Sequence, residues 1–265
     1  MIAPPLLTLE AVGVTYQRSI VALHGIDLTV QAGQIVAILG VNGAGKTTTL
    51  RAISGFVGLD QARVTGGCIR HRGTAIETLP PHLITRRGIV LVPERDKVFP
   101  NLTVAENLAA VVTAAAGTAE RRRREQLVYE HFPRLAARRS SEAGLLSGGE
   151  RQMLAVGAAL LCGPELLLID ELSLGLAPII VGELGERLKT IRSELGLAIL
   201  LVEQSAAFAL QMADHAYVLE NGRVAAAGPA ATLAADTDIQ RYYLGTAAGE
   251  RRSYRDGRTR PGACQ

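Results

Sequence analysis

Gly40-Val41-Asn42-Gly43-Ala44-Gly45-Lys46-Thr47 is the stretch that decides the fold of this chain. It has the form G-x-x-x-x-G-K-[ST], whose glycines let successive backbone N–H groups point at phosphate oxygens. The continuous apolar run before it, 35–39, predicts a strand over 34–39 that is covered on both faces. Residues 46–54 after it have a helical pattern. A buried strand, a glycine-rich turn and a helix in this order predict a phosphate-binding loop in an α/β protein.

The composition predicts one large globular unit. The chain has 265 residues, of which 48% are hydrophobic and 20% are charged, so a sizeable core is expected. The apolar stretches are shorter than the ~20 residues that span a bilayer, and no secretory signal is visible. If the protein acts in transport, another chain therefore supplies the channel. The three cysteines lie far apart, which predicts reduced thiols.

The positive charge is concentrated at one end. The net charge is +3, and residues 247–265 hold five arginines against two acids, so the rest of the chain is close to neutral. Nucleic-acid binding needs a basic face, and we therefore expect no nucleic-acid partner. The tail 246–265 is poor in apolar residues and is expected to be disordered. A second basic run, 121–124, predicts a solvated helix face, with contact to anionic lipid headgroups as the alternative.

Hydrophobic patterning places the other elements along the chain. The alternating segment 6–16 predicts an edge strand. Further strands are expected at 25–30, 88–93, 166–170 and 198–202, a helix at 179–194, and a hairpin of 216–220 and 223–227 that turns at Asn221-Gly222. Residues 103–161 are rich in Ala, Leu, Arg and Glu. We expect a domain over 6–245 with a helical subdomain inserted at about 96–161.

Two carboxylates follow the apolar strand 166–170. Asp170 ends this strand, which would aim its carboxylate beside a magnesium ion bound by the Thr47 hydroxyl. Asp170 would act on this ion from its outer shell or through a water. Glu171 is the candidate base that orients and polarises an attacking water. Lys46 would reach the β and γ phosphates of a nucleotide. A solvated Asp-Glu pair at a strand end is the alternative, and the phosphate loop argues against it.

The motif Leu146-Ser147-Gly148-Gly149-Glu150 precedes that strand. Alone, Ser-Gly-Gly is an ordinary helix cap. With the phosphate loop and the 166–171 strand it resembles the signature motif of ABC transporter ATPases, and the resemblance covers about 6–245. It implies an α/β fold: a P-loop, RecA-like core with an antiparallel β subdomain and an inserted α-helical subdomain. It also implies ATP and Mg²⁺, and a motif that closes over the γ-phosphate held by a second ATPase subunit.

The resemblance assigns site residues by position. The catalytic residues are Glu171 and Gln204, and the metal ligands are Thr47, Glu94 and Asp170. The ATP-binding residues come from the first strand, the phosphate loop and the signature motif: Tyr16, Gly40, Asn42, Gly43, Ala44, Gly45, Lys46, Thr47, Thr48, Ser147, Gly148, Gly149 and Glu150. Tyr16 would stack on adenine, with edge-strand packing as its alternative.

Two departures from the general pattern point to a subfamily. Most ABC ATPases carry glutamine at the place of Glu94 and histidine at the place of Gln204. Val92-Pro93-Glu94 and Val202-Glu203-Gln204 resemble the shorter ATPase subunit of branched-chain amino acid importers, whose relatives import urea or short amides. Leu172 stands where the family usually has proline, and it frees φ in the turn behind the candidate base.

The resemblance implies a set of partners. These are a second, longer ATPase subunit in a head-to-tail dimer, transmembrane permease subunits and, indirectly, a solute-binding protein, with this chain peripheral on the cytoplasmic face of the membrane. The surface at 94–108, with Phe99 and Leu102 as apolar anchors, is the expected membrane-subunit contact. The alternatives are a soluble ABC ATPase of repair or translation, an ATP-binding regulatory subunit with little turnover, and a P-loop kinase.

Overall fold

The phosphate-loop strand β3 (Ile35–Leu39) lies inside a six-stranded sheet with the order β10-β9-β3-β8-β7-β6. The computed structural model describes residues 4–17, 19–95, 97–111, 117–237 and 239. Strands β6 to β9 and β3 are parallel, and β10 pairs antiparallel with β9. The other strands of this sheet are β6 (Ile89–Val92), β7 (Leu166–Asp170), β8 (Ala198–Glu203), β9 (His215–Glu220) and β10 (Arg223–Pro229).

The side chains of β3 alternate between the two faces of this sheet. Val36 and Ile38 belong to the core that lies between the two sheets. Ala37 and Leu39 belong to a core shared with two helices near the end of the described chain. Helices therefore cover one face and the second sheet covers the other, as the continuous apolar run predicts.

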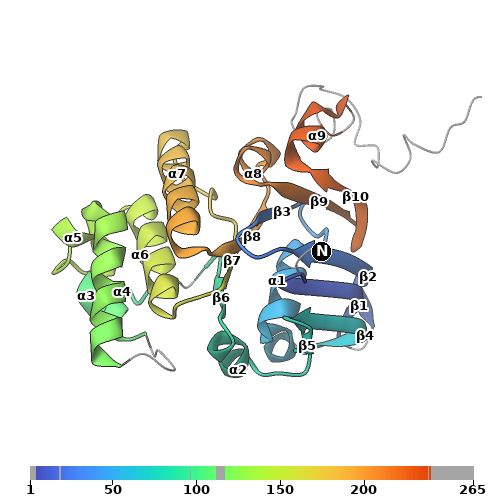
Figure 1. Cartoon of the computed structure of the whole chain (residues 1–265), viewed down its shortest axis with the longest axis horizontal. Helices are drawn as coiled ribbons and strands as arrows, with labels where there is room; N and C mark the ends of the chain where they lie inside the picture. Colours follow the sequence, from blue (N-terminus) through green and yellow to red (C-terminus); the bar gives the residue numbers. More distant parts are fainter. Residues whose placement is uncertain (1–3, 18, 96, 112–116, 238, 240–265) are drawn as a thin grey trace, which may run out of the picture.

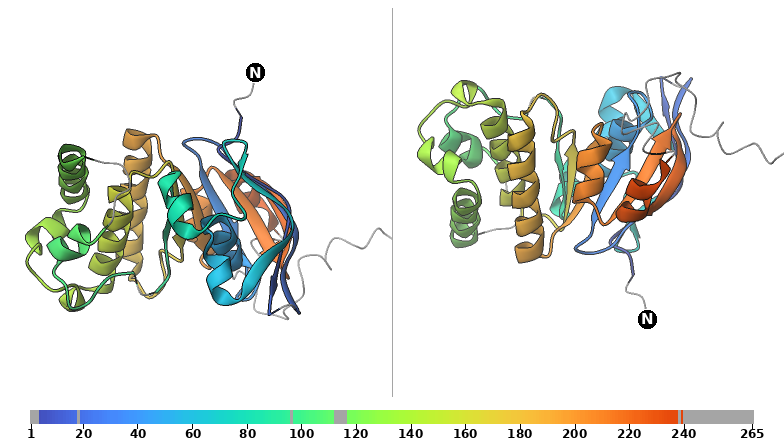
Figure 2. Two further views of the ribbon diagram at one scale, coloured as in Figure 1. Left: turned by 90° about the horizontal axis from the view of Figure 1, so that it is seen from below. Right: turned by 90° about the horizontal axis from the view of Figure 1, so that it is seen from above.

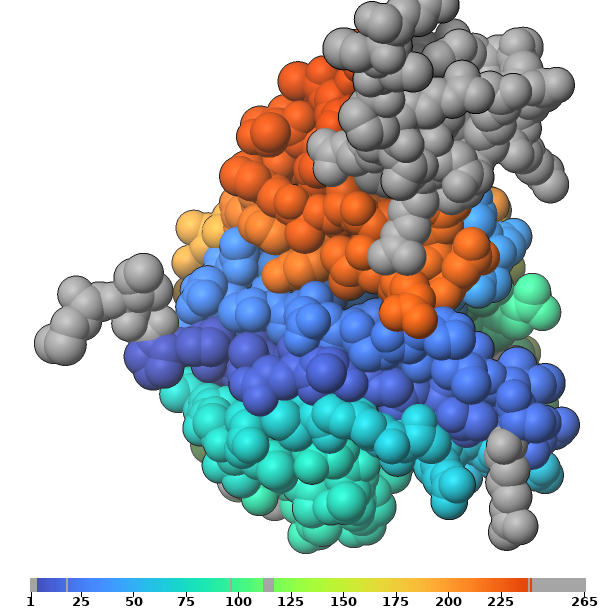
Figure 3. Space-filling view, turned by 90° about the vertical axis from the view of Figure 1, so that its right-hand side faces the viewer, coloured from blue at the N-terminus to red at the C-terminus, as the bar shows by residue number. Residues whose placement is uncertain are grey.

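The second sheet is antiparallel and has the order β2-β1-β4-β5 (Figures 1 and 3). Its strands are β1 (Leu7–Tyr16), β2 (Ile20–Val30), β4 (Ala62–His71) and β5 (Thr74–Ala75). The prediction of an edge strand at 6–16 is wrong, because β1 lies between β2 and β4. Sequence patterning missed β4, whose Gly66-Gly67 pair is unfavourable in a strand. A Cβ at Gly67 would lie 2.2 Å from the Glu10 carbonyl oxygen, so this irregular crossing requires glycine.

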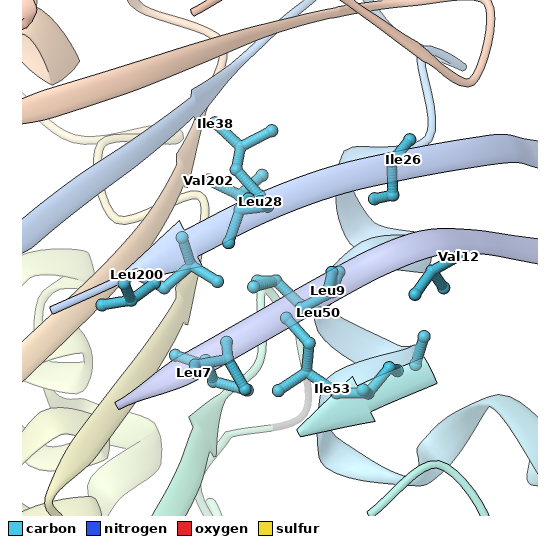
Figure 4. Packing of buried hydrophobic residues seen from close by; sticks show 14 of the residues in the cluster. Leu7, Leu9, Val12, Ile26, Leu28, Ile38, Leu50, Ile53, Leu200 and Val202 are labelled. Carbon is cyan, nitrogen blue, oxygen red and sulfur yellow. The ribbon is translucent and has the colours of Figure 1, made fainter. Parts of the chain in front are cut away.

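Helix α1 (Lys46–Ser54) is clamped between the two sheets. Figure 4 shows its Leu50 and Ile53 among Leu7 and Leu9 of β1, with Leu200 of β8 nearby. Each fully buried side chain of this size contributes about 1.5–3 kcal/mol. The packing fixes α1, and with it the loop at its N-terminus.

The remaining helices lie around the six-stranded sheet, and α3 to α6 gather at the end of the molecule farthest from β1 and β4 (Figures 1 and 2). They are α2 (Pro81–Arg86), α3 (Val104–Ala109), α4 (Thr118–His131), α5 (Pro133–Ala137), α6 (Gly148–Leu161), α7 (Pro178–Leu195), α8 (Ala206–Met212) and α9 (Ala230–Ala235), with 3-10 turns η1 (Phe56–Asp60) and η2 (Ala143–Leu145). Within the described ranges, no helix has the length and apolar character needed to cross a bilayer.

The predicted helices at 46–54 and 179–194 and the hairpin at Asn221-Gly222 are confirmed. The basic run 121–124 is more than a solvated face. Arg121 donates to the Leu108 and Ala109 carbonyls at the end of α3, and Arg124 donates to the Leu161 carbonyl at the end of α6. These arginines satisfy carbonyls that have no partner within their own helix. The tail 246–265 lies outside the described residues.

Candidate functional site

A cavity of about 430 Å³ opens over the phosphate loop. Five separate parts of the sequence meet there. Four of them follow β3, β6, β7 and β8, because the carboxyl ends of parallel strands share one edge of the sheet, and the fifth comes from β2. Its lining is Ala22, Asn42, Gly43, Gly45, Lys46, Thr47, Thr48, Glu94, Arg95, Glu171, Leu174 and Gln204. The structure therefore brings both predicted catalytic residues to the phosphate loop, together with two of the three predicted metal ligands.

The Lys46 side chain folds back onto the start of the phosphate loop. Its buried Nζ donates to the carbonyl oxygens of Gly40 at 2.9 Å and Val41 at 3.3 Å. Burial lowers the pKa of Lys46, and the charges of Glu171 and Asp170 oppose that change. The ammonium group thus sits beside the carboxylates, held by weak carbonyl partners that an anion can replace.

The glycines of the loop differ in what they permit. Gly45 has φ 103°, and a Cβ there would lie 2.6 Å from Leu23 Cδ2 of β2. A Cβ at Gly40 would lie 2.5 Å from the Leu219 carbonyl oxygen. Both positions need glycine for close approach. Two residues that were predicted to bind ATP, Gly40 and Ala44, do not line the cavity. Gly43 has open space around a Cβ built there, so its φ of 80°, and not a close neighbour, is what favours glycine.

The predicted metal ligands Thr47 and Asp170 are in contact. The Thr47 hydroxyl donates to Asp170 Oδ1 at 3.2 Å. Burial raises the pKa of Asp170 to about 6, and the neighbouring Glu171 and Glu94 charges act in the same direction. Glu94 accepts a hydrogen bond from Arg95 Nε at 3.0 Å. A buried acid among other acids is the setting that a divalent cation neutralises.

The residues present fit a partly coordinated ion. In the described part of the chain, no three His, Cys, Asp or Glu side chains gather as a metal cage. Mg²⁺ does not need one, because it usually keeps one or two protein carboxylates and takes its other ligands from phosphate and water. One hydroxyl and a nearby buried carboxylate meet that description.

We expect Asp170→Asn to stabilise the protein when neither nucleotide nor metal is present. The pKa of Asp170 is about 6 in the fold, against an ordinary value of 3.8 for an aspartate side chain. The folded state therefore holds a proton that the unfolded chain has already lost, and stability falls as pH rises through this window. Above pH ~6 the cost reaches up to about 3 kcal/mol. Asn keeps the acceptor for Thr47 and removes this cost.

Thermal unfolding at two pH values tests this expectation. The gain for Asp170→Asn should be largest at pH ~7.5 and shrink to about a third of that at pH ~4.5. Glu130→Gln, an exposed change on α4, is the control and should melt like wild type at both values. Equal melting of Asp170→Asn and wild type at pH ~7.5 would contradict a costly buried charge.

Glu171 lies in a strained turn. Its φ is +51°, in the left-handed region that costs a non-glycine residue roughly 1–2 kcal/mol. Its N–H donates to the Val202 carbonyl at 2.9 Å, and the next residue, Leu172, is buried in the core against the helices. Leu172 lacks the φ restraint of proline, yet its burial holds the chain on one side of Glu171.

Gln204 and Tyr16 occupy different positions relative to the cavity. Gln204 is exposed and lines it directly after β8. Tyr16 lies at the end of β1, where its ring packs against the core and its hydroxyl lies 3.2 Å from Thr48 Oγ1. Tyr16 does not line this cavity. The Tyr16 ring thus has a structural role in packing against the core. Its stacking on adenine stays a prediction.

The signature motif is not brought to the phosphate loop within one chain. Ser147 caps α6 through a capping box: the Glu150 N–H donates to Ser147 Oγ at 3.3 Å, and the Ser147 N–H donates to Glu150 Oε2 at 2.8 Å. A Cβ at Gly149 would lie 2.5 Å from Ile180 Cγ2, so the start of α6 packs tightly on α7. Ser147, Gly148, Gly149 and Glu150 do not line the cavity.

Sequence reasoning missed Ala22, Arg95 and Leu174, which line the cavity. Ala22 reaches it from β2, and no sequence pattern signals that approach. It also missed Glu203, an acid at the end of an apolar strand that accepts two hydrogen bonds from Ser173. The sequence did contain a signal for Glu203, since an acid at the end of a buried apolar strand is unusual enough to indicate a role.

The family model described as ABC transporter matches residues 23–173. The chain belongs to the ABC transporter family. It is 44% identical over 233 residues to the high-affinity branched-chain amino acid transport ATP-binding protein BraG of Pseudomonas aeruginosa, covering 87% of this chain and 96% of that protein. It is 38% identical to the branched-chain amino acid transport ATP-binding protein LivF of Archaeoglobus fulgidus, described as probable, covering 84% and 92%.

A solved structure agrees with the fold. The dimeric post-hydrolysis structure of an ATP-binding cassette with ADP and Pi shares 25% identity, has a TM-score of 0.72 and covers 84% of this chain and 98% of that chain. The predicted P-loop ABC ATPase fold is confirmed. As a family member, this ABC protein is an ATP-binding and ATP-hydrolysing subunit.

Proposed function

We propose that this ABC ATPase powers an importer of branched-chain amino acids. One observation carries the proposal: the cavity over the phosphate loop collects a lysine, threonine hydroxyls, and two acids and an amide from three strand ends, in a chain 44% identical to a branched-chain amino acid transport subunit. The site accounts for ATP hydrolysis, and the likeness to BraG and LivF supports the solute class.

The phosphate loop binds the nucleotide phosphates. Backbone N–H groups of Gly43 to Thr48 and the positive end of the α1 dipole attract the anion. Lys46 exchanges the Gly40 and Val41 carbonyl oxygens for β and γ phosphate oxygens, which are stronger partners because they are charged. Thr47 and Asp170 would hold Mg²⁺, with Glu94 beside them. When bound, the ion supplies charge neutralisation between the phosphates.

Two residues act on the water. Glu171 accepts a proton from the attacking water and orients it toward the γ-phosphate. Its backbone is fixed before the reaction by the Val202 carbonyl, which reduces the reorganisation needed in the transition state. Gln204 donates from its amide group to a γ-phosphate oxygen.

Replacing Gln204 separates hydrogen bonding from titration. Gln204→Ala is expected to lower turnover on the order of tenfold, the scale of one lost charge-assisted hydrogen bond. Gln204→His should restore much of the rate and add a pH dependence between roughly 6 and 7.5, because imidazole titrates there. A pH–rate profile of the three proteins with intact membrane subunits measures this. Wild-type turnover in the alanine variant would leave Gln204 without a role in the reaction.

A second ATPase subunit completes the site. The signature motif Ser147-Gly148-Gly149-Glu150 would close over the γ-phosphate bound by the partner, in a head-to-tail dimer. An exposed apolar residue lies at each of the two surfaces that would meet. Leu145, beside the signature motif, is 71% exposed, and Leu174, which lines the cavity over the phosphate loop, is 52% exposed. Isolated exposed apolar side chains are common, yet the place of these two supports pairing there. We propose a different, longer ATPase as the partner.

A groove beside Glu94 supports contact with transmembrane subunits. It has a volume of about 490 Å³ and joins apolar Phe56, Leu59, Leu91 and Pro93 to Glu94 and Asp170. Leu59 is 73% and Phe99 is 61% exposed. A permease segment seated here would touch the same loop that reaches the metal site. Such a contact supports the proposal that the chain is a peripheral subunit on the cytoplasmic face of the membrane.

Solute uptake in a deletion strain tests the function. Removal of the gene should abolish high-affinity uptake of labelled leucine, isoleucine and valine and leave urea and acetamide uptake unchanged. The wild-type gene should restore uptake, and a Lys46→Ala gene expressed to the same level should not. Loss of urea or amide uptake instead would favour the related importers. Unchanged uptake of all solutes would favour an ABC ATPase outside transport.

A further inference from the structure

Glu203 is a buried acid that no step above uses. It is the last residue of β8 and is 1% exposed. Its Oε1 accepts the Ser173 backbone N–H at 2.9 Å, and its Oε2 accepts the Ser173 hydroxyl at 2.5 Å. Burial raises the pKa of Glu203, and the hydrogen bonds from Ser173 oppose that rise. Both carboxyl oxygens thus accept from Ser173, and the backbone N–H of the preceding residue, Leu172, also acts on the carboxylate as a hydrogen-bond donor.

Ser173 lies two residues after the candidate base, so Glu203 holds the far side of its turn. On the near side, the Glu171 N–H donates to the Val202 carbonyl, also in β8. Between these anchors Glu171 adopts its left-handed conformation. Such a conformation persists only where the surroundings over-determine it. Residues at the end of β8 therefore hold the turn by hydrogen bonds at two positions, Glu171 and Ser173.

We propose that Glu203 is a positioning residue, whose carboxyl group clamps Ser173 and so holds Glu171 in line with the attacking water. The inference rests on the proposed role of Glu171. It follows that the hydrogen-bonding shape of residue 203 matters for turnover and its charge does not. ATP binding is separate, because Glu203 does not line the cavity over the phosphate loop.

Two conservative variants separate the hydrogen bonds of residue 203 from its charge. Glu203→Gln loses the charge but keeps an oxygen for the Ser173 N–H, and its NH₂ donates to the Ser173 hydroxyl. It should keep more than about half of the wild-type kcat. Glu203→Asp keeps the charge but is one methylene too short to reach both donors. It should lose about 10- to 100-fold in kcat, the scale of a misplaced catalytic group. The Kd for ATP should stay within about threefold for both.

The rival explanation is electrostatic, since the charge of Glu203 also acts on Lys46. An electrostatic role reverses the order, with Glu203→Asp active and Glu203→Gln impaired, and that outcome would overturn the proposal. Ser173→Ala provides a second test through the same contact. It should lower kcat by several-fold, and adding it to Glu203→Asp should cost less than the two single losses multiplied together, because the two residues act as one unit.

Controls separate this proposal from general instability and from the function beneath it. Leu200→Ala removes a buried side chain of the same strand on the face toward the other sheet. It should lower the melting temperature and leave kcat within about twofold, measured below melting. A Glu203→Asp kcat no lower than that control would refute the clamp. Glu171→Gln runs in the same assay: if it keeps wild-type kcat, the role of the base fails, whatever Glu203 does.

Discussion

Glu171→Gln is expected to reduce ATP turnover by about 10²- to 10⁴-fold, the usual contribution of a positioned general base. The amide keeps the size of the side chain and cannot take a proton from water. The backbone contact to the Val202 carbonyl is unaffected, so the turn should persist. ATP should still bind, because Lys46 and the loop are intact. The variant should therefore accumulate as a closed pair of ATPase subunits with ATP and Mg²⁺.

Light scattering during size-exclusion chromatography detects this pair. The wild-type protein is expected to return to separate subunits as it hydrolyses ATP, and the variant to stay paired. Glu130→Gln, an exposed change of the same type on α4, is the matched control and should behave like wild type. Wild-type turnover in Glu171→Gln would remove Glu171 as the base. A slow variant that never pairs would count against the head-to-tail closure.

Lys46→Ala should strongly weaken ATP binding and nearly abolish turnover. The substitution removes the cation facing the phosphates, which is expected to weaken ATP binding about 10- to 100-fold. Turnover at saturating ATP should fall by on the order of 10³-fold, because charge builds on the transferred group in the transition state. It also leaves the Gly40 and Val41 carbonyl oxygens without their donor. Titration with a fluorescent ATP analogue and a phosphate-release assay measure the two effects.

A matched variant shows that the effect is local. Lys189→Ala removes a half-buried lysine of α7 that pairs only with Glu186 in the described structure, and it should bind and hydrolyse ATP like wild type. The contrast with Glu171→Gln is informative, since one variant should bind ATP without turning it over and the other should hardly bind. ATP affinity near wild type in Lys46→Ala would place the phosphates elsewhere.

The phosphate loop, its strand and its helix were predictable because they are local. Gly45 and Lys46 act within a few residues of one another, and the apolar run of β3 signals burial on both faces. Asp170 and Glu171 were predictable for the same reason, since they directly follow an apolar strand. The identity of the family followed from two such local motifs in one chain.

Contacts between distant segments were decided by the tertiary structure. The segment β4 forms a strand although its glycines disfavour one. It does so because it pairs with the edge of β1, and this pairing supplies backbone hydrogen bonds that stabilise the extended chain. Arg121 and Arg124 look like a solvated charge run, and their roles appear only where α3 and α6 end beside α4. Every residue has a backbone carbonyl, so the sequence does not indicate which carbonyls these arginines contact.

The sequence by itself determined the nucleotide loop, the paired acids and the family. Only the tertiary structure decided how the turn at Glu171 is held, because its anchors, Val202 and Glu203, lie about thirty residues further along the chain and meet it through sheet register. The strain at Glu171 is likewise invisible in the sequence, since a left-handed glutamate is stabilised by its surroundings and not by its own preference.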